Sequence, residues 1–457
     1  MKIRRIYRFK CILIITLIDI FCTNMSVAQP NSLFRWSFDG NIRYRYEKWD
    51  NMNAKSYGDN PEIGNPDDNI LLQRIIAGTT LHLNDHITIS AHLQDSRAFG
   101  WSLAQDKEPD AFKIHPQNVN EPFYIMNPHE EFLEIYEANI RVDSIFKHFS
   151  VIAGRQKIAY TDYRVFGPGS WGNTGRWSWD AIRLMIKKDN WSGGIWYGGT
   201  KIHDPEKTCL PFTHTEYNGG GIHGNMQFMD YLQTDVYLAH KHQGSADYIR
   251  EKNINRNWIG FRFYNPESIP WKYEASYTHE FGKENEMVIH AYGFFFKLGY
   301  QFEKLFWNPC VTFRYTYAEG DHPGTEYNEK FDPVFGAGDR YYGWMNLVKW
   351  SNLDDMEIMV ELYPLIGMRI ELKYNILKIP QSDDITIMGN LELPEGKNHL
   401  GNEIDLFTEY DFNDRWQFTA VLGYFIAKDA VTITTTQPGN ALMISFQVRY
   451  TFNLKIV

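Results

Sequence analysis

Apolar and polar side chains alternate along most of this chain with a period of two. In the segment 34–46, one parity is apolar: Phe34, Trp36, Phe38, Ile42 and Tyr44. The other parity is polar or charged: Arg35, Ser37, Asp39, Asn41, Arg43 and Arg45. Because successive side chains of a β-strand point to opposite faces, this pattern predicts strands with one apolar face and one face in water. The same pattern recurs down to the segment 440–452.

The alternation, together with the turn residues between its segments, predicts eighteen strands. They are 34–47, 70–83, 86–96, 131–143, 148–158, 179–188, 191–200, 218–229, 231–241, 256–264, 270–280, 288–302, 309–318, 355–363, 367–378, 401–411, 415–426 and 440–452. Their lengths match the ~9–11 residues that cross a membrane at a tilt, whereas strands of soluble sheets average about 5–6 residues. The predicted fold class is all-β: a transmembrane antiparallel β-barrel of about 18 strands, with 16 possible. A soluble sandwich or propeller is the alternative.

Short and long links alternate between the predicted strands. The longer links are 48–69, 97–130, 159–178, 201–217, 319–354 and 379–400. Short periplasmic turns and long extracellular loops are the topology of outer-membrane barrels. This order is kept only if the segment 341–350 belongs to a loop rather than to a strand. The chain then has eight inner turns and nine outer loops, with both termini on the periplasmic side.

The first 28 residues have the pattern of a cleaved secretory signal peptide. Five cations precede or enter an apolar core from Cys11 to Phe21, and small residues stand before Gln29. Its removal takes away five of 46 Lys and Arg and one of 56 Asp and Glu, so the net charge falls from −10 to −14. Residues 29–457 are then predicted to form a single outer-membrane barrel domain. An acidic chain of this kind gives no indication of nucleic acid binding.

The remaining composition argues against other classes of protein. No later stretch approaches the ~20 apolar residues of a membrane-spanning helix. The chain has no G-x-S-x-G, H-E-x-x-H or paired-cysteine motif, so we expect no enzyme activity, no metal and no cofactor. His240 and His242 could share a strand face, but without further ligands they are predicted to be rim residues. Cys209 and Cys310 fall at opposite ends of the predicted barrel, so no disulfide is expected.

Strand parity directs a set of cations towards the lumen. They are Arg43, Arg45, Arg74, Arg183, Lys187, Arg262, Lys272, Arg314, Arg369, Lys373 and Arg449. Lumen cations make a pore prefer anions, and a guanidinium matches a carboxylate with two parallel hydrogen bonds. Inward acids such as Glu274, Glu371, Asp405 and Glu409 offer a second interpretation. On that interpretation the arginines form ion pairs within the wall instead of meeting a substrate.

Several sequence blocks resemble the outer-membrane alginate export family. The most specific lies in 154–184: G-R-Q at 154–156, Y-T-D-Y-R-V-F-G-P at 160–168, W-G-N-T-G-R at 171–176 and D-A-I-R-L at 180–184. Weaker matches follow in order: L-Q-D-S-R at 93–97, Y-A-E-G-D at 317–321, F-D-P-V-F-G at 331–336, Y-G-W at 342–344 and G-N-E-I-D-L at 401–406. The resemblance implies an eighteen-stranded porin-like barrel in the outer membrane of a Gram-negative bacterium. It also implies passage of an acidic polysaccharide, an arginine-rich constriction and gating loops.

Strand parity alone does not predict where the charged residues of the block 154–184 lie. Arg155 shares the parity of Val151 and Ala153, which would direct it to lipid, where a charge near the midplane costs ~2–4 kcal/mol. A bulge or a position at the strand end would remove this conflict. Arg164, Arg176 and Asp180 could pin the following tight loop to the wall. Folded into the lumen, that loop would be a constriction; otherwise these residues order the outer rim.

Aromatic residues are predicted to serve two purposes. Tyr163, Trp171, Trp177 and Trp179 surround the charges of this block and could stack on sugar rings. Aromatic residues at strand ends more often form the interfacial girdle that faces lipid. That assignment is predicted for Trp36, Tyr44, Trp196, Trp271 and Tyr450.

The sequence therefore predicts a channel whose candidate substrate-binding or pore residues are cationic, with one acid. They are Arg43, Arg74, Arg155, Arg164, Arg176, Asp180, Arg183, Arg314, Arg369 and Lys373. The expected partners are outer-membrane lipid, an anionic polysaccharide or oligosaccharide, the barrel assembly machinery and periplasmic polymer-secretion components. The resemblance favours export of an alginate-like polyuronate. Uptake of acidic oligosaccharides and general diffusion of small anions remain open, and an enzyme or a loop-mediated receptor are the other classes considered.

Overall fold

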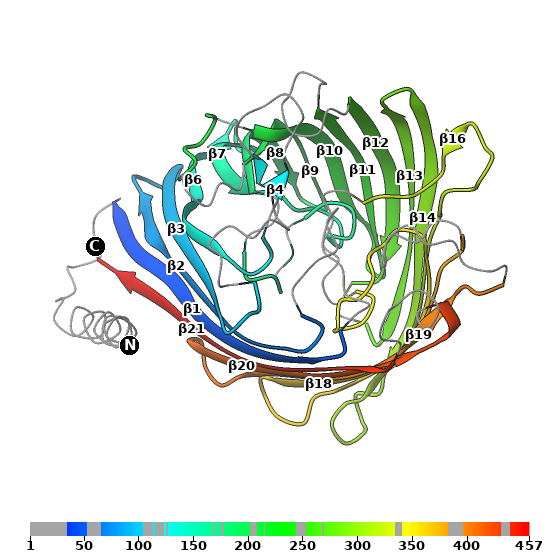
Figure 1. Cartoon of the computed structure of the whole chain (residues 1–457). Helices are drawn as coiled ribbons and strands as arrows, with labels where there is room; N and C mark the ends of the chain where they lie inside the picture. Colours follow the sequence, from blue (N-terminus) through cyan, green and yellow to red (C-terminus); the bar gives the residue numbers. More distant parts are fainter. Residues whose placement is uncertain are drawn as a thin grey trace.

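The chain forms a closed antiparallel β-barrel whose first and last strands are hydrogen-bonded to each other (Figure 1). The computed structural model describes residues 34–52, 65–103, 113–114, 123–124, 127–167, 169, 171–174, 178–201, 208–213, 215–243, 253–266, 269–333, 341–382, 396–430 and 439–456. The predicted signal peptide, 1–28, lies outside these residues and stays a prediction. Among the described residues, no helix has the length and apolar character needed to cross a bilayer.

Eighteen long strands make up the barrel wall. They are β1 (Arg35–Asp50), β2 (Asp68–His82), β3 (Ile87–Phe99), β6 (Glu131–Ile145), β7 (Phe149–Lys157), β8 (Ser178–Lys188), β9 (Trp191–Lys201), β10 (Thr215–Met229), β11 (Leu232–Gln243), β12 (Ile254–Tyr264), β13 (Trp271–Glu284), β14 (Met287–Gln301), β15 (Cys310–Ala318), β17 (Leu353–Leu362), β18 (Met368–Lys378), β19 (His399–Asp411), β20 (Trp416–Ala427) and β21 (Ala441–Lys455). Three short strands complete the set: β4 (Lys113–Ile114) pairs with β5 (Phe123–Tyr124), and β16 (Tyr327–Asn328) pairs in parallel with β14.

The predicted strand number and topology are confirmed. Each of the eighteen predicted segments overlaps one barrel strand, and the segment 341–350 contains no strand. The eight links on the side of residues 34 and 456 are short, and we call this side the turn end. The opposite side, which we call the loop end, carries the long links. One link there is short, because β13 and β14 are joined by the tight turn Asn285-Glu286, in which Asn285 adopts a positive φ of 53°.

The wall alternates as the sequence predicts, with apolar side chains outside and polar ones inside. On β21, Ile444 and Phe446 are 39% and 51% exposed, while Ser445 between them is 2% exposed on the lumen side. One prediction about the girdle is wrong. Trp196 is 2% exposed and packs on the lumen side, because the outward parity of β9 belongs to its neighbours Ile195 and Tyr197.

The two cysteines within the described residues are both buried and free, as expected. Cys310 begins β15 at the turn end, and Cys209 lies in the loop-end segment 208–213. The thiols are therefore at opposite ends of the barrel. The interior is occupied by parts of the loops that fold back into the lumen, and these loops position the candidate site.

Candidate functional site

The loop after β7 folds into the barrel, which is one of the two placements considered for this block; that it narrows the passage stays a prediction. We call the described residues of 158–174 the constriction loop. Arg43 on β1 donates to the carbonyl oxygen of Gly172 at 2.7 Å and to Asn173 Oδ1 at 3.1 Å. Arg74 on β2 donates to the same Gly172 carbonyl at 3.3 Å, and Arg45 donates to the carbonyl of Trp171. Lumen-facing guanidinium groups thus hold one end of the loop against β1 and β2.

Asn173 fixes this end of the loop more firmly than any charge. Its side chain is fully buried, and its amide nitrogen lies 2.7 Å from the carbonyl oxygen of His129 and 3.1 Å from that of Gln73. The backbone N–H of Asn173 donates to the Pro128 carbonyl. The amide therefore satisfies carbonyl groups of β2 and of the segment before β6 together. Sequence reasoning did not select Asn173, although its place within the W-G-N-T-G-R block was a signal.

The part of the constriction loop that contains Arg164 reaches the far side of the lumen. Arg164 forms ion pairs with Asp162 and, at 3.3 Å, with Glu274 on β13. Its guanidinium carbon also lies 3.3 Å from the ring centroid of Phe295 on β14. Burial alone would lower the pKa of Arg164, but the carboxylates of Asp162 and Glu274 outweigh it and raise that pKa above its ordinary value. The loop is therefore held against β13 at Arg164 and against β1 at Gly172 and Asn173, and it spans the lumen.

Aromatic stacking anchors the middle of the constriction loop to the wall between β8 and β11. The ring of Tyr160 lies between those of Phe166 and His223, with centroid distances of 4.6 and 4.8 Å. Phe166 also contacts Trp179 on β8 and Trp196 on β9. Trp179 is thus a support for the loop, and Trp177 of the predicted sugar-stacking set lies outside the described residues.

A second inward loop, 341–352, meets the constriction loop. The rings of Trp344 and Phe407 stack at 4.0 Å, and Trp344 Nε1 donates to Glu371 at 3.2 Å. The backbone N–H groups of Trp344 and Met345 donate to Asp405 and Glu403. The two loops then touch, because Trp171 packs edge-on against Trp344 with centroids 5.4 Å apart. The acids of β18 and β19 are therefore engaged in holding this loop.

Arg155 and Asp180 form a buried network in the wall. Two nitrogens of Arg155 donate to the two oxygens of Asp180 at 2.8 and 2.9 Å, and both residues are at most 1% exposed. Arg155 also donates to Glu134 and to the carbonyl of Cys209, while the N–H of Phe212 donates to Asp180. The β7–β8 register is continuous, so no bulge lies there; the strand-end position near segment 208–213 keeps this charge away from lipid.

The candidate cations on the β15 to β19 side are paired with acids. Arg314 lies 3.0 Å from Glu357, and Arg369 lies 2.8 Å from Glu371. Lys373 is 3.7 Å from the same Glu371. These pairs match the interpretation in which inward acids neutralise inward cations. Arg176 lies outside the described residues, so its predicted role stays a prediction.

The opposite side of the lumen is different. Arg74, Arg43 and Arg449 stand in register on the adjacent strands β2, β1 and β21, and we call them the basic row. Among the described residues, neither Arg74 nor Arg449 has an acidic partner within ion-pair distance, and the same holds for Arg183 on β8. The charges of these three guanidinium groups are therefore not balanced by an ion pair with a described acid.

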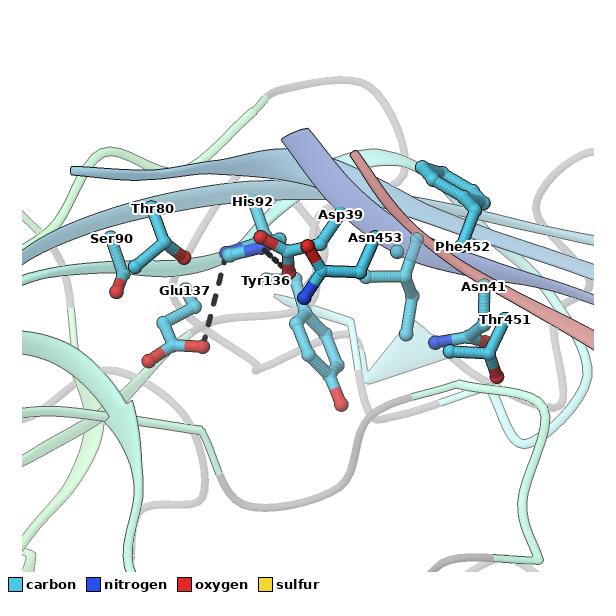
Figure 2. A pocket seen from close by; sticks show the side chains of 12 residues that line it. Asp39, Asn41, Thr80, Ser90, His92, Tyr136, Glu137, Thr451, Phe452 and Asn453 are labelled. Carbon is cyan, nitrogen blue, oxygen red and sulfur yellow. Dashed lines mark hydrogen bonds and ion pairs between the residues drawn. The ribbon is translucent and has the colours of Figure 1, made fainter. Parts of the chain in front are cut away.

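A cavity of about 390 Å³ lies next to the basic row, on the side of the turn end (Figure 2). Its lining residues come from β1, β2, β3, β6 and β21. Asn41, Ile76 and Thr451 each lie two positions from a member of the basic row on the same strand, a distance of about 7 Å at 3.3 Å per residue. The basic row thus stands between this cavity and the constriction loop.

An eighteen-stranded barrel with short turns at one end, long loops at the other and loops folded into a polar lumen is a porin-like outer-membrane channel. Comparison with protein families agrees: a family model described as alginate export matches residues 34–444. The chain belongs to the alginate export family. It is an outer-membrane protein of a Gram-negative bacterium, with its outward apolar side chains in lipid.

Solved porins share the fold at low sequence identity. OccD3 (OpdP) of Pseudomonas aeruginosa superposes with a TM-score of 0.56 at 12% identity, covering 92% of this chain and 91% of that chain. OccAB1 of Acinetobacter baumannii gives a TM-score of 0.56 at 10% identity, with 94% and 100% covered. Pseudomonas aeruginosa OpdK, solved with vanillate, gives 0.56 at 9% identity, with 92% and 98% covered. No curated protein matches the chain at a significant level.

Proposed function

We propose that this protein passes an anionic polysaccharide, an alginate-like polyuronate, through the outer membrane in the direction of export. Membership of the alginate export family supports the substrate class and the direction. The observation that carries the proposal is the basic row, in which Arg74 and Arg449 flank Arg43. Neither Arg74 nor Arg449 has an acidic partner among the described residues. A polyuronate has a carboxylate on every sugar, and guanidinium groups bind carboxylates with good geometry.

Within this proposal the candidate residues have different roles. Arg74, Arg183 and Arg449 bind passing carboxylates. Arg43 and Arg164 position the constriction loop, and Arg155 with Asp180 stabilises the wall near segment 208–213. The cations with acidic partners balance the charge of the opposite wall: Arg314, Arg369 and Lys373. The barrel has no catalytic role in this proposal. The barrel assembly machinery would insert it, and periplasmic secretion components would deliver the polymer.

Reversal potentials in planar bilayers under a KCl gradient test the proposal. We expect the wild-type channel to prefer anions, and added polymannuronate to reduce its conductance. The double variant Arg74→Gln, Arg449→Gln should shift the reversal potential towards zero and weaken the block about tenfold or more, since two charge-assisted contacts are lost. Arg35→Gln is the matched control, because Arg35 is exposed at the turn end beside Asp85.

Three outcomes would contradict the proposal. A cation-selective wild-type channel without polymer block would show that the substrate is not anionic. An unchanged reversal potential in the double variant would show that the basic row does not set the anion preference. Block by short organic anions as strong as block by polymannuronate would favour general diffusion of small anions. The direction has its own test: deletion of the gene in a polymer-producing cell should leave polymer in the periplasm.

A further inference from the structure

The cavity beside the basic row contains buried polar atoms that lack hydrogen-bond partners. His92 is 8% exposed, and its Nε2 lies 2.8 Å from Asp39 Oδ1. Because a carboxylate only accepts, Nε2 carries the proton in the neutral ring and Nδ1 is left as an acceptor. Among the described residues, Nδ1 of His92 and Oδ1 of Asn41 are buried without a hydrogen-bond partner. Buried polar atoms normally have a hydrogen-bond partner, so both can accept a hydrogen bond from a ligand in this cavity.

The other groups around the cavity are hydroxyls, amides and a carboxylate. Glu137 Oε2 lies 4.0 Å from His92 Nδ1, beyond hydrogen-bond distance. Figure 2 shows Asp39, His92 and Glu137 gathered on one side, with Asn453 and the ring of Tyr136 beside them. The hydroxyl of Thr451 lines the same space. Such a set of acceptors with a few amide and hydroxyl donors suits a ligand that carries several hydroxyl groups.

Because the cavity lies beside the basic row, a ligand that binds in the cavity can also carry a carboxylate that binds to the basic row. Asn41 and Thr451 lie about 7 Å from Arg43 and Arg449 along their strands, and Asp39 lies about 13 Å from Arg43. The shorter of these distances, about 7 Å, is on the order of the size of one sugar ring. A sugar acid can therefore place its carboxylate on the basic row and its hydroxyl groups in the cavity.

A metal ion fits this space less well. Among the described residues, no group of three or more His, Cys, Asp or Glu side chains is arranged to hold a metal. His92 already uses one nitrogen for Asp39, and Glu137 accepts a hydrogen bond from Asn139 at 2.9 Å. The oxygen and nitrogen atoms that remain are spread over the lining instead of converging on one point.

We propose that this cavity is a hydroxyl-binding subsite, which binds the hydroxyl groups of a uronate whose carboxylate lies on the basic row. This inference rests on the proposed function and deepens it, because it names the feature by which the channel distinguishes sugar acids from simple organic anions. The basic row selects charge. The cavity selects hydroxyl groups on the periplasmic side, before the polysaccharide reaches the constriction loop.

Block of the single-channel current tests the subsite with two matched probes, D-glucuronate and hexanoate. Both have six carbons and one carboxylate, but hexanoate has no hydroxyl groups. For the full-length channel we expect glucuronate to block at a concentration about five- to tenfold lower than hexanoate, as one or two hydrogen bonds would give. The variant Glu137→Gln and the double variant Asn41→Leu, Thr451→Val should each reduce this ratio, the double variant to about one.

The controls separate this inference from the proposed function. Thr312→Val changes a buried lumen-facing hydroxyl on β15, away from the cavity, and should leave the ratio unchanged. Heat-modifiable migration in gels reports that each variant is folded. Equal block by the two probes in the wild type, or an unchanged ratio in both variants, would overturn the subsite even if the channel prefers anions. A conductance change caused by Ca²⁺ alone and lost in Glu137→Gln would make the cavity a cation site and overturn it as well.

Discussion

Arginines of the same strand parity have different roles here, and the acids within reach decide which. Arg314 faces the lumen beside Glu357 and Arg369 beside Glu371, so their charges are balanced within the wall. Arg449 faces the same lumen with no acid nearby among the described residues. A buried or half-buried cation without a partner is costly, because the desolvation is not offset. The unbalanced charges of Arg74 and Arg449 agree with the proposed role of these residues in binding carboxylates.

Arg164 offers a test of the constriction loop at the level of one side chain. In Arg164→Met, Glu274 keeps Arg262 at 2.9 Å and Lys297 at 3.2 Å, whereas Asp162 in the loop loses its ion pair. The loop loses its ion pair and its contact with Phe295. We expect noisier open-channel current and a higher mean conductance in single-channel recordings, with an unchanged thermal midpoint of the barrel.

Arg141→Met is the control for this variant. Arg141 also forms an ion pair with a neighbouring acid, Asp143 at 2.7 Å, but it lies near the turn end and far from the constriction loop. Its single-channel traces should match those of the wild type. Identical traces for Arg164→Met and the wild type would mean that Arg164 does not restrain the loop.

At the scale of elements, each barrel strand is specified by its alternation, whereas each inward loop is specified by contacts with distant strands. The strand β20 shows the first case: Leu422 faces lipid at 43% exposure, and Gln417 is on the lumen parity beside Asp411. The constriction loop shows the second case, since Gly172 and Asn173 are held by residues of β1, β2 and the segment before β6.

The two faces of β20 give a direct test of the wall. Leu422→Arg places a charge in lipid and should destabilise the folded barrel by ~2–4 kcal/mol. Gln417→Arg places the same side chain in the lumen, where Asp411 can pair with it, and should cost less than about 1 kcal/mol. Urea titration of the protein inserted in lipid vesicles measures both. Similar losses for the two variants would contradict the assigned faces.

At the scale of the whole molecule, stability depends on closure. The pairing of β1 with β21 joins the two ends of the described chain over the register from Ser37–Lys455 to Asp50–Leu442. In a bilayer, unpaired backbone groups at an open edge have no water to bind and cost several kcal/mol each. A barrel that loses one terminal strand therefore has two edges with no partner.

A truncated chain tests closure. Removal of residues 441–457 deletes β21 and leaves the edges of β1 and β20 unpaired. We expect no heat-modifiable, membrane-inserted species in this variant. Removal of 456–457 alone, which lies beyond β21, is the control and should insert normally. Insertion of the shorter chain with channel activity would show that a seventeen-stranded closure is accessible.

Most of the barrel strands could be predicted from the sequence, because the alternation of apolar and polar residues is a local pattern. The alternation on β21 or β1 depends only on which neighbours face lipid and which face water, so the sequence alone gives the strand number and the direction of Arg43, Arg74 and Arg449. The face on which an aromatic residue lies is harder to predict where the alternation is weak. Trp196 was assigned to the girdle, yet packing against Phe166 and Trp179 keeps it inside.

From the sequence by itself came the prediction of about eighteen alternating strands, the lumen parity of several arginines and, by resemblance, the family. Only the tertiary structure decided which cations have acidic partners, since Arg314 and Glu357 are adjacent through register and not through spacing in the chain. It also decided that Asn173 secures the constriction loop and that a cavity lies beside the basic row. The physical reason is that strand parity is a property of near neighbours, whereas charge compensation and loop position depend on residues that only the barrel register brings together, such as Arg43 and Gly172.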